Sequence, residues 1–348
     1  MERTNRELQS LSQRATRSLL EAADAGRGRT LLVGLSGGAD STALLFLLAD
    51  AEDRHGWRVR AAHVDHGIQN EAIRTAFRAT ATSAARIAGV GLDVVAVDAA
   101  SELAGGGGIE AAARRVRYRA LAEIAELRHA ELIAVAHTLD DQAETVLLHV
   151  IRGTGIDGLA AMPPIGPVPE VEAEPPLVRP LLGHTRAETR RVCELFGFEP
   201  AEDPANRDLT RVRNRLRQEL LPLLREFNPR IETGLAELAA SARGDRALLE
   251  SQSLAALTQA SLDGDEFGSL DRRALLDYPP ALQARVLRAY AARFGSPLTA
   301  ERTRAALAVL ASGHGTVELG GERVLRVAGG RVMLEDGGAA AAGATSQI

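Results

Sequence analysis

The sequence predicts an α/β protein, in which a doubly wound, Rossmann-like parallel sheet is followed by a second, smaller and mostly helical domain. Between residues 30 and 160, short β-branched or apolar runs alternate with longer amphipathic stretches, an order typical of βαβ units. After about residue 230 the order changes to helices followed by short strands with glycine turns. The 348 residues are enough for two domains, because single domains cluster near ~100–150 residues.

Four apolar runs are predicted to be the strands of the first domain. They are TLLVGL (30–35), VRAAHVD (59–65), LDVVAVD (92–98) and LIAVAH (132–137). Helices are expected at about 40–54, 70–88, 109–128 and 139–151. In the second of these helices the apolar residues recur at spacings of three and four, which places them on one helix face.

Prolines mark the end of this alternation. Residues 162–180 hold seven of the 14 prolines, which lack a backbone donor, so a loop is predicted there. A helix at 185–198 and a strongly basic helix at 211–227, broken near Pro222, are expected next. Short strands are predicted at 316–319, 322–328 and 331–335. We therefore divide the chain into a catalytic domain (1–215), a basic linker helix (216–235), a C-terminal domain (236–335) and a disordered tail (336–348).

The composition excludes several classes of protein. A formal charge of −5 argues against a uniformly basic surface, so a nucleic acid would have to meet a local basic patch. No apolar run approaches the ~18 residues that span a bilayer, and the N-terminus has no signal-peptide pattern. The single cysteine, Cys193, excludes an internal disulfide and fits a cytoplasmic location. All 41 basic residues are arginines, whose planar fork suits phosphate.

The string SGGADS, residues 36–41, lies between the first strand and the first helix. Backbone N–H groups at a helix N-terminus favour an anion, and glycine lets the backbone approach it closely. Asp40 would repel a bare polyphosphate, so a phosphate site here requires a bridging Mg²⁺. The alternative is a tight Gly-Gly turn in which Asp40 and Ser41 only cap the helix.

Two further segments carry polar residues where a doubly wound sheet would bind a ligand. His63 and Asp65 follow the second strand and could contact nucleotide or metal, although a structural role for the histidine is the alternative. Arg114 and Arg117 are three residues apart, hence on neighbouring parts of one helix face. That face either binds phosphate or is simply solvated.

The segment AHTLDDQAET (136–145) places acids together on a helix. Asp140 and Glu144 are at i and i+4, so their like charges destabilise the helix unless a cation lies between them. A metal ion or a substrate ammonium would supply that cation. The alternative is that Thr138 caps the helix and the acids of its first turn stabilise the helix dipole.

The segment RVRNRLRQELLPLLR (211–225) contains five arginines and one acid, Glu219. It is a candidate for the local phosphate-binding surface that the acidic chain otherwise lacks. The alternative is solvated charge, but arginines at alternate positions point in several directions around a helix, which indicates several partners.

These motifs, in their order along residues 30 to about 228, resemble the tRNA(Ile)-lysidine synthetase family. SGGADS is similar to the PP-loop of ATP pyrophosphatases, and HTLDDQAET and DPANRD with RNRLR make the resemblance specific. The resemblance implies ligation of free L-lysine to C2 of the wobble cytidine in the CAU anticodon of a minor tRNA(Ile), using ATP and Mg²⁺. It also implies a cytoplasmic enzyme, no membrane partner, a homodimer, and a C-terminal domain with a structural or tRNA-binding role.

The resemblance also assigns roles to single residues. It implies nucleotide binding by the loop and the second strand, metal binding by Asp40 and Asp141, and catalysis around the acid helix. The nucleotide residues would be Ser36, Gly37, Gly38, Ala39, Asp40, Ser41, His63 and Asp65; the catalytic ones Asp40, His137, Asp140, Asp141 and Glu144; and the tRNA- or substrate-facing ones Arg114, Arg117, Arg152, Arg213, Asn214 and Arg217.

Three other functions compete with this interpretation. Sulfur-transferring PP-loop enzymes use paired cysteines or an iron–sulfur cluster, which one cysteine cannot supply. Amidating relatives need a glutaminase module or free ammonia, and no glutaminase segment is recognisable. A non-catalytic adenine-nucleotide sensor would need the loop but neither the acids nor the basic helix.

Overall fold

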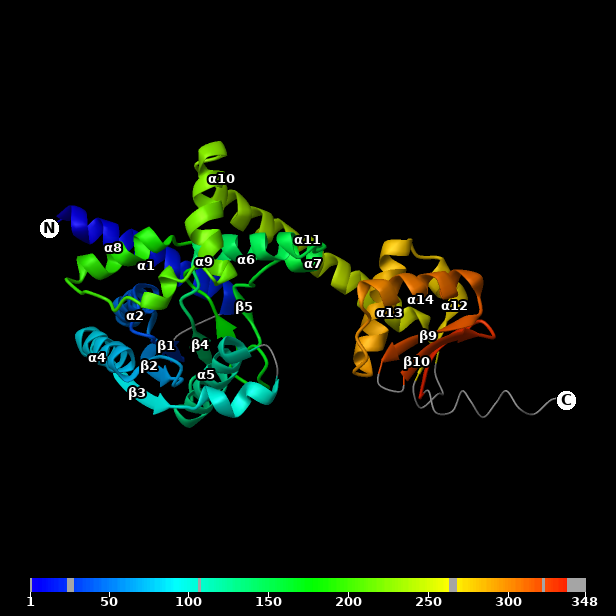
Figure 1. The fold of residues 1–348 in the computed structure, drawn as a ribbon, viewed down its shortest axis with the longest axis horizontal. Coiled ribbons are helices and arrows are strands. Elements are labelled where there is room, and N and C mark those ends of the chain that lie inside the picture. The colour runs from blue at the N-terminus through cyan, green and yellow to red at the C-terminus, as the bar shows by residue number, and fades with distance from the viewer. Residues whose placement is uncertain (1, 24–27, 106–107, 263–267, 321–322, 337–348) are drawn as a thin grey trace. The chain divides into compact units, whose positions relative to one another are not determined.

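The chain folds into two units, and a six-stranded sheet forms the centre of the N-terminal one. The computed structural model describes residues 2–23, 28–105, 108–262, 268–320 and 323–336 (Figure 1). The chain divides into two units, Met1–Arg243 and Gly244–Ile348, and each is described here by itself. Within the described residues, no helix combines the length and the apolar character needed to cross a membrane.

The sheet of the N-terminal unit has the strand order β3-β2-β1-β4-β6-β5, and all neighbours are parallel except β5 and β6. Its strands are β1 (Thr30–Gly34), β2 (Arg58–Asp65), β3 (Gly91–Ala96), β4 (Leu132–Ala134), β5 (Ile165–Gly166) and β6 (Leu177–Val178). The chain runs outward from β1 to β3 and returns to the other side of β1 at β4. The predicted doubly wound sheet is thus confirmed, and its switch point lies between β1 and β4, where such sheets bind ligands.

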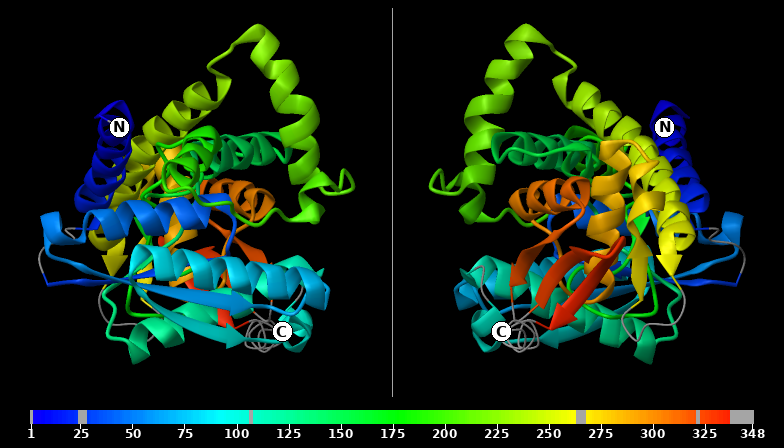
Figure 2. Two further views of the ribbon diagram at one scale, coloured as in Figure 1. Left: turned by 90° about the vertical axis from the view of Figure 1, so that its left-hand side faces the viewer. Right: turned by 90° about the vertical axis from the view of Figure 1, so that its right-hand side faces the viewer.

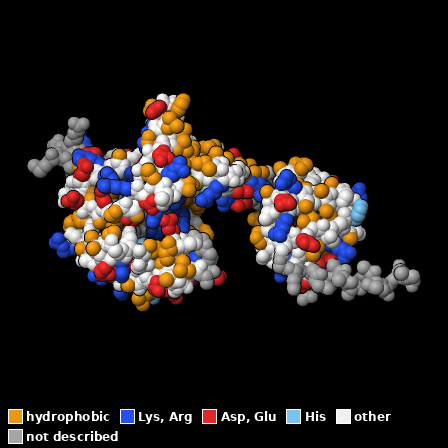
Figure 3. All heavy atoms as spheres, viewed as in Figure 1, with side chains coloured by type: hydrophobic (Ala, Val, Ile, Leu, Met, Phe, Trp, Pro, Cys, Tyr) orange, Lys and Arg blue, Asp and Glu red, His pale blue; other side chains and the backbone are white. Residues whose placement is uncertain are grey.

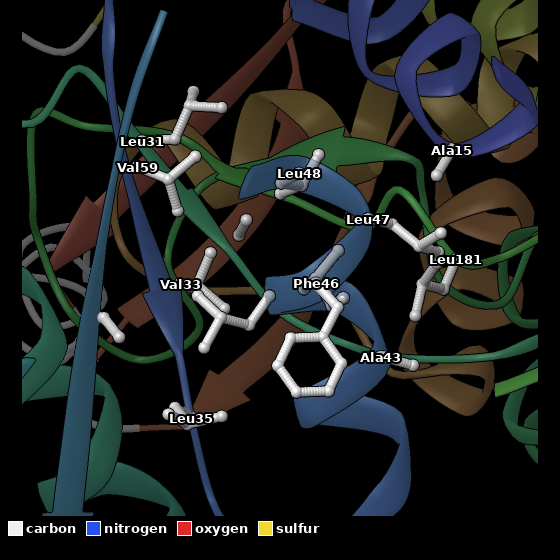
Figure 4. Packing of buried hydrophobic residues seen from close by; sticks show 14 of the residues in the cluster. Ala15, Leu31, Val33, Leu35, Ala43, Phe46, Leu47, Leu48, Val59 and Leu181 are labelled. Atoms are coloured by element: carbon white, nitrogen blue, oxygen red, sulfur yellow. The ribbon is translucent and has the colours of Figure 1, made fainter. Parts of the chain in front are cut away.

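Helices cover both faces of this sheet. One face packs against α1 (Glu2–Ala23), α2 (Ala39–Asp50), α4 (Glu71–Ala88) and α8 (Arg186–Leu195), and the other packs mainly against α5 (Gly108–Leu127). Alternation along β1 divides its side chains, because Leu31 and Val33 enter the first core and Leu32 enters the second. Figure 4 shows Val33 and Phe46 meeting in the first core. The short α3 (Glu52–His55) and η1 (Ala99–Gly105) complete the connections.

The sequence predicted a loop over the whole proline-rich segment, residues 162–180. The structure shows that part of this segment forms strands. Leu177 and Val178 form β6, which pairs in parallel with Ile133 and Ala134 of β4. Both β6 residues are buried, and β5 pairs with them from the outer edge. Two apolar residues between prolines are enough for a strand when a neighbouring strand supplies the hydrogen bonds, which a local pattern does not reveal.

The predicted basic helix is continuous but irregular. It consists of α9 (Val212–Arg215), the π-helical turn η3 (Leu216–Leu220) and α10 (Leu221–Phe227). Pro222 lacks a backbone N–H, so the hydrogen-bond pattern changes immediately before it. The chain then reverses into α11 (Ile231–Ala260), as Figure 2 shows. Three further helices of this unit precede α9 in the chain. They are α6 (Leu139–Ile151), α7 (Ile156–Leu159) and η2 (Pro204–Arg207).

The C-terminal unit has its own core between helices and an antiparallel sheet of order β7-β8-β11-β10-β9. The elements are β7 (Ser261–Leu262), β8 (Ser269–Asp271), α12 (Arg272–Leu276), α13 (Pro280–Arg293), α14 (Ala300–Ser312), β9 (Gly315–Gly320), β10 (Arg323–Ala328) and β11 (Arg331–Asp336). The three strands predicted at the end of the chain are therefore confirmed, although residue 322 lies outside the described residues. Of the predicted tail, Asp336 ends β11 and the remainder lies outside the described residues.

Candidate active site

The loop Ser36–Ser41 is shaped by its own hydroxyl groups. The Oγ atoms of Ser36 and Ser41 lie 2.9 Å apart, and the Ser41 hydroxyl also contacts the carbonyl of Gly38 at 3.1 Å. Gly38 is the N-cap of α2, and no side chain caps this helix in the described structure. The alternative in which Asp40 and Ser41 serve only as helix caps is therefore wrong, and the first turn of α2 can face an anion.

Gly37 allows the loop to approach α4 closely. Its φ is +93°, and a Cβ atom built there would lie 2.6 Å from the carbonyl oxygen of Phe77. A side chain at this position would meet both an unfavourable backbone conformation and a backbone atom. This position of the loop therefore requires glycine.

Asp40 points from the loop toward the start of α8. Its carboxylate accepts a hydrogen bond from the Thr189 hydroxyl, and Oδ2 lies 3.9 Å from Nε of Arg186. Burial raises the pKa of Asp40 above its usual value, the hydrogen bond from Thr189 opposes the rise, and the Asp141 charge adds to it. A cation beside Asp40 would relieve this electrostatic cost.

At the end of β2, His63 and Asp65 are held by different partners. His63 is buried, and because a carbonyl can only accept, its Nδ1 donates to the carbonyl of Leu35 at 2.9 Å. Burial lowers the pKa of His63, so the ring is neutral at pH 7 and Nε2 is an acceptor. The single N–H at Nε of Arg74 is shared between the two carboxylate oxygens of Asp65, at 2.8 and 2.9 Å. Burial opposes its charge, but Arg74 and the N–H of Gly67 outweigh burial and lower the pKa of Asp65.

Arg186, a residue of the chain itself, provides the cation between the acids of α6. Its Nη1 donates to Glu144 at 2.6 Å, its Nη2 pairs with Asp141, and its backbone N–H donates to Asp140 at 2.9 Å. Glu144 is fully buried and also pairs with Nε of Arg217 at 2.9 Å. Glu144 therefore has cationic partners from the chain itself, and Asp140 has a backbone N–H donor.

Thr138 caps α6, as the alternative interpretation expected, and Asp141 completes a capping box with it. The Asp141 carboxylate accepts from the backbone N–H and the hydroxyl of Thr138, both at 2.9 Å, and the Thr138 hydroxyl accepts from the Asp141 N–H. Burial opposes the negative charge, but Arg186 and the other neighbours prevail and lower the pKa of Asp141. Asp141 therefore combines a capping role with a position on the cavity wall.

The basic helix turns two of its arginines inward. Arg217 contacts Glu144, and Nη2 of Arg213 donates to the Thr145 hydroxyl at 3.0 Å. Asn214 is buried and donates to the carbonyls of Ala205 and Asp208, each at 2.8 Å. These three residues connect the helix to α6 and to the DPAN segment.

Aromatic and imidazole groups line the cavity beside the acids. Arg114 and Arg117 lie over the ring of Tyr118, with their Cζ atoms 4.8 and 5.2 Å from its centroid. Within the described structure, the buried Tyr118 hydroxyl and the buried Nδ1 of His137 have no hydrogen-bond partner. Burial lowers the pKa of His137 to about 3, which makes it a neutral but weak base.

One cavity of about 700 Å³ at the switch point collects most of the predicted residues. Figure 3 shows basic and acidic side chains side by side around a hollow on this unit. The predicted residues on its wall are Ser36, Gly38, Ala39, Asp40, Ser41, His63, Asp65, Arg117, His137, Asp141 and Arg217. Those that do not line it are Gly37, Arg114, Asp140, Glu144, Arg152, Arg213 and Asn214. Arg152 is exposed at the end of α6.

Comparisons with known proteins identify the family of this chain. The PP-loop domain model matches residues 9–224, and the TilS substrate binding domain model matches residues 270–333. A tRNA(Ile)-lysidine synthase of Leifsonia xyli is 39% identical over 307 residues, which cover 86% of this chain and 88% of that protein. A second, of Salinispora tropica, is 39% identical over 330 residues, covering 92% and 94%. The chain belongs to the tRNA(Ile)-lysidine synthase family.

Membership of the tRNA(Ile)-lysidine synthase family confirms the resemblance found in the sequence. Among solved structures, the U34-tRNA thiolase NcsA from Methanococcus maripaludis with its [4Fe-4S] cluster has a TM-score of 0.56 and 16% identity, covering 68% of this chain and 79% of that one. At this identity the likeness concerns the fold alone. It supports the α/β architecture of the N-terminal unit.

The carboxylates of this cavity would suit a magnesium ion that is shared with bound phosphates. No group of three or more His, Cys, Asp or Glu side chains in the described ranges is placed to hold a metal ion by itself. Mg²⁺ usually takes only one or two carboxylates and completes its shell with phosphates and water. Asp40 and Asp141 line the same cavity, and the charge of Asp141 raises the pKa of Asp40.

Sequence reasoning missed Arg186, which contacts more of the predicted acids than any other described side chain. The residue belongs to TRAETRR, which the sequence identifies only as the beginning of a helix. It lies 42 positions from Glu144 along the chain, so no local spacing connects the two. Its position four residues after the string RPLL (179–182) was the only available signal.

Proposed function

We propose that this protein ligates L-lysine to C2 of the wobble cytidine in the CAU anticodon of tRNA(Ile), with ATP as the activating substrate. The observation that carries the proposal is that the PP-loop, Asp141 and Arg217 meet in one cavity in a member of the lysidine synthase family. An enzyme of this kind must place a nucleotide, an amine and a base together. A nucleotide sensor would need only the loop.

The proposed reaction has two displacements. The cytidine O2 attacks the α-phosphate of ATP, pyrophosphate leaves, and C2 of the adenylated base becomes electrophilic. The ε-amine of lysine then forms the C2–N bond, and AMP leaves with the O2 oxygen. Bound Mg²⁺ would neutralise phosphate charge, with Asp40 and Asp141 as the residues that hold it.

The attacking amine must first lose a proton. With a pKa of about 3, His137 is a poor acceptor, and the lowered pKa of Asp141 weakens that carboxylate as a base as well. These pKa directions argue against His137 as the group that receives the proton.

The surroundings of Cys193 argue against the competing function, transfer of sulfur to tRNA. It is the single cysteine of the chain, it is buried, and burial raises the pKa of its thiol to about 12. A thiol that stays protonated at pH 7 is a poor nucleophile and a poor sulfur carrier. The ligation of an amine requires no thiolate from the protein.

The test mixes the full-length protein with Mg-ATP, radiolabelled lysine and a tRNA(Ile) transcript carrying CAU. Label should enter this tRNA and should not enter the methionine tRNA with the same anticodon. A protein that binds nucleotide but incorporates no lysine would contradict the proposal.

The homodimer that the resemblance implies stays a prediction. The mass of the protein in solution, compared with 36.9 kDa for one chain, checks it.

A further inference from the structure

The first turn of α8 contacts acids from two separate motifs. Arg186 binds Asp141 and Glu144 of α6 through its guanidinium and binds Asp140 through its backbone N–H. One turn later, the Thr189 hydroxyl donates to Asp40 of the PP-loop. Both side chains therefore sit between the loop that faces the nucleotide and the helix that carries the acids.

The rest of α8 does not have this environment. Arg190 and Arg191 pair with Glu202 and Glu7 at 3.4 and 3.1 Å, and their side chains are 67% and 45% exposed. Exposed pairs of this kind contribute little, because water screens them. The side chain of Arg186 is only 21% exposed and faces carboxylates that are less exposed still.

The contacts of Arg186 divide the acids into two classes. Asp141 and Glu144 receive direct pairing from its guanidinium, whereas Asp40 lies 3.9 Å from Nε and depends on Thr189 for its hydrogen bond. Because a guanidinium is planar, one bound side chain fixes the relative directions of Asp141 and Glu144. Of Asp40, Asp141 and Glu144, Asp40 is therefore the acid that the guanidinium does not hydrogen-bond.

We propose that Arg186 and Thr189 are positioning residues, which hold Asp40 of the PP-loop and Asp141 of α6 in the single arrangement that the substrates require. The proposal rests on the proposed function for its catalytic consequence. Neither residue needs to touch the reacting atoms. Each acts through a carboxylate that lines the cavity, and an error of about 1 Å in such a group can cost about 100-fold in rate.

The first experiment compares Arg186→Gln with Arg191→Gln in the full-length chain. Arg191 lies on the same helix and is paired at the surface, so it is a matched control. We expect kcat for lysine ligation to fall about 100-fold in the first variant and to stay at the parent value in the second. An Arg186→Gln protein that melts like the parent and keeps its kcat within about threefold would overturn the proposal.

Arg186→Lys separates positioning from charge balance. Lysine keeps the positive charge but loses the fork that joins two carboxylates. We expect this variant to recover the melting temperature and to remain at least about tenfold low in kcat. Recovery of both quantities would show that Arg186 only balances charge, and the positioning role would be wrong.

The second experiment remains decisive if the Arg186 variants fail to fold. Thr189→Val keeps the side-chain volume and removes the hydrogen bond to Asp40. It should weaken binding of a non-hydrolysable Mg-ATP analogue about tenfold, the usual effect of a hydrogen bond to a charged group. In an Asp40→Asn background the same change should have little further effect, because interacting residues are not additive. An undiminished effect in that background would refute action through Asp40.

This cycle uses nucleotide alone, so its result is independent of lysine and tRNA. A parent protein that shows the coupling but incorporates no lysine would contradict the proposed function and leave the positioning role standing. A parent that incorporates lysine but shows additive binding effects would contradict the positioning role and leave the proposed function standing.

Discussion

The PP-loop and the acid–arginine cluster form two walls of one cavity but are built in opposite ways. We define the cluster as Asp140, Asp141, Glu144, Arg186 and Arg217. In the loop, the serine hydroxyls contact partners no more than five positions away. In the cluster, Glu144 pairs with arginines 42 and 73 positions away. The loop is therefore a local structure, whereas the cluster exists only after distant segments have packed together.

The two walls also depend on different energies. The loop relies on backbone conformation and close approach, which Gly37 permits. The cluster relies on charges that have left water, and such charges stabilise a protein only while every partner is present. The predictions below test this contrast, from the largest expected effect to the smallest.

Asp40 belongs to the loop and also lies 3.9 Å from Arg186 of the cluster, so its loss should have the largest effect. We expect Asp40→Ala to lower tRNA-dependent release of pyrophosphate to below about a thousandth of the parent rate, because a group that organises the transition-state charge is removed. Asp53→Ala, an exposed position on α3, serves as the control and should release pyrophosphate at the parent rate. Full activity of Asp40→Ala would remove Asp40 from the mechanism.

Glu144→Ala tests the cluster as a structural unit. The change leaves Arg186 and Arg217 without the carboxylate they share, so we expect the free energy of unfolding to fall by about 3–5 kcal/mol. Denaturant titration measures the change. Glu219→Ala, which removes the exposed pair with Arg215, should cost no more than about 0.5 kcal/mol. Equal costs for the two variants would mean that burial of the cluster contributes nothing.

Gly37→Ala tests the local wall. The new methyl group would meet the Phe77 carbonyl in a backbone conformation that alanine disfavours, at an expected cost of about 1–3 kcal/mol. Gly89→Ala is the matched control, because Gly89 also has a positive φ of +70° but nothing lies within 4 Å of its Cβ position. The Gly37 variant should be the less stable of the two and should bind the Mg-ATP analogue more weakly. Identical stabilities would argue against the close approach.

Asp65 should show the smallest effect, visible as a pH dependence. Its pKa is lowered in the folded protein by Arg74 and Gly67, so its stabilisation is complete above the unfolded value of 3.8 and is lost as the pH falls through the folded value. The difference in unfolding free energy between the parent and Asp65→Asn should therefore shrink below about pH 4. A difference that stays constant from about pH 7 to pH 3 would contradict the ion pair with Arg74.

The sequence predicted the local features of both walls well. The strands β1 to β4 and helices α2, α4, α5 and α6 lie within a few residues of their predicted positions. Thr138 caps α6 as one of the two interpretations of HTLDDQAET expected. These features depend on periodicity and on side chains within a few positions of one another, and both are visible in a linear chain.

The long-range features escaped prediction for a common reason. The strand β6 forms from two residues between prolines because β4 lies beside them. The cation that Asp140 and Glu144 require is Arg186, whose position in the sequence carries no sign of the acids it meets.

By itself, the sequence determined the doubly wound sheet, the PP-loop and the family to which the chain belongs, because periodicity, turn residues and motif strings are local properties of the chain. Only the tertiary structure decided which charge balances which. It assigned Arg186 and Arg217 to the buried Glu144 and placed Asp40 3.9 Å from Arg186, beyond hydrogen-bond distance. Charge pairing depends on distance in space and on exclusion of water, and both are set when segments that are far apart in sequence pack together.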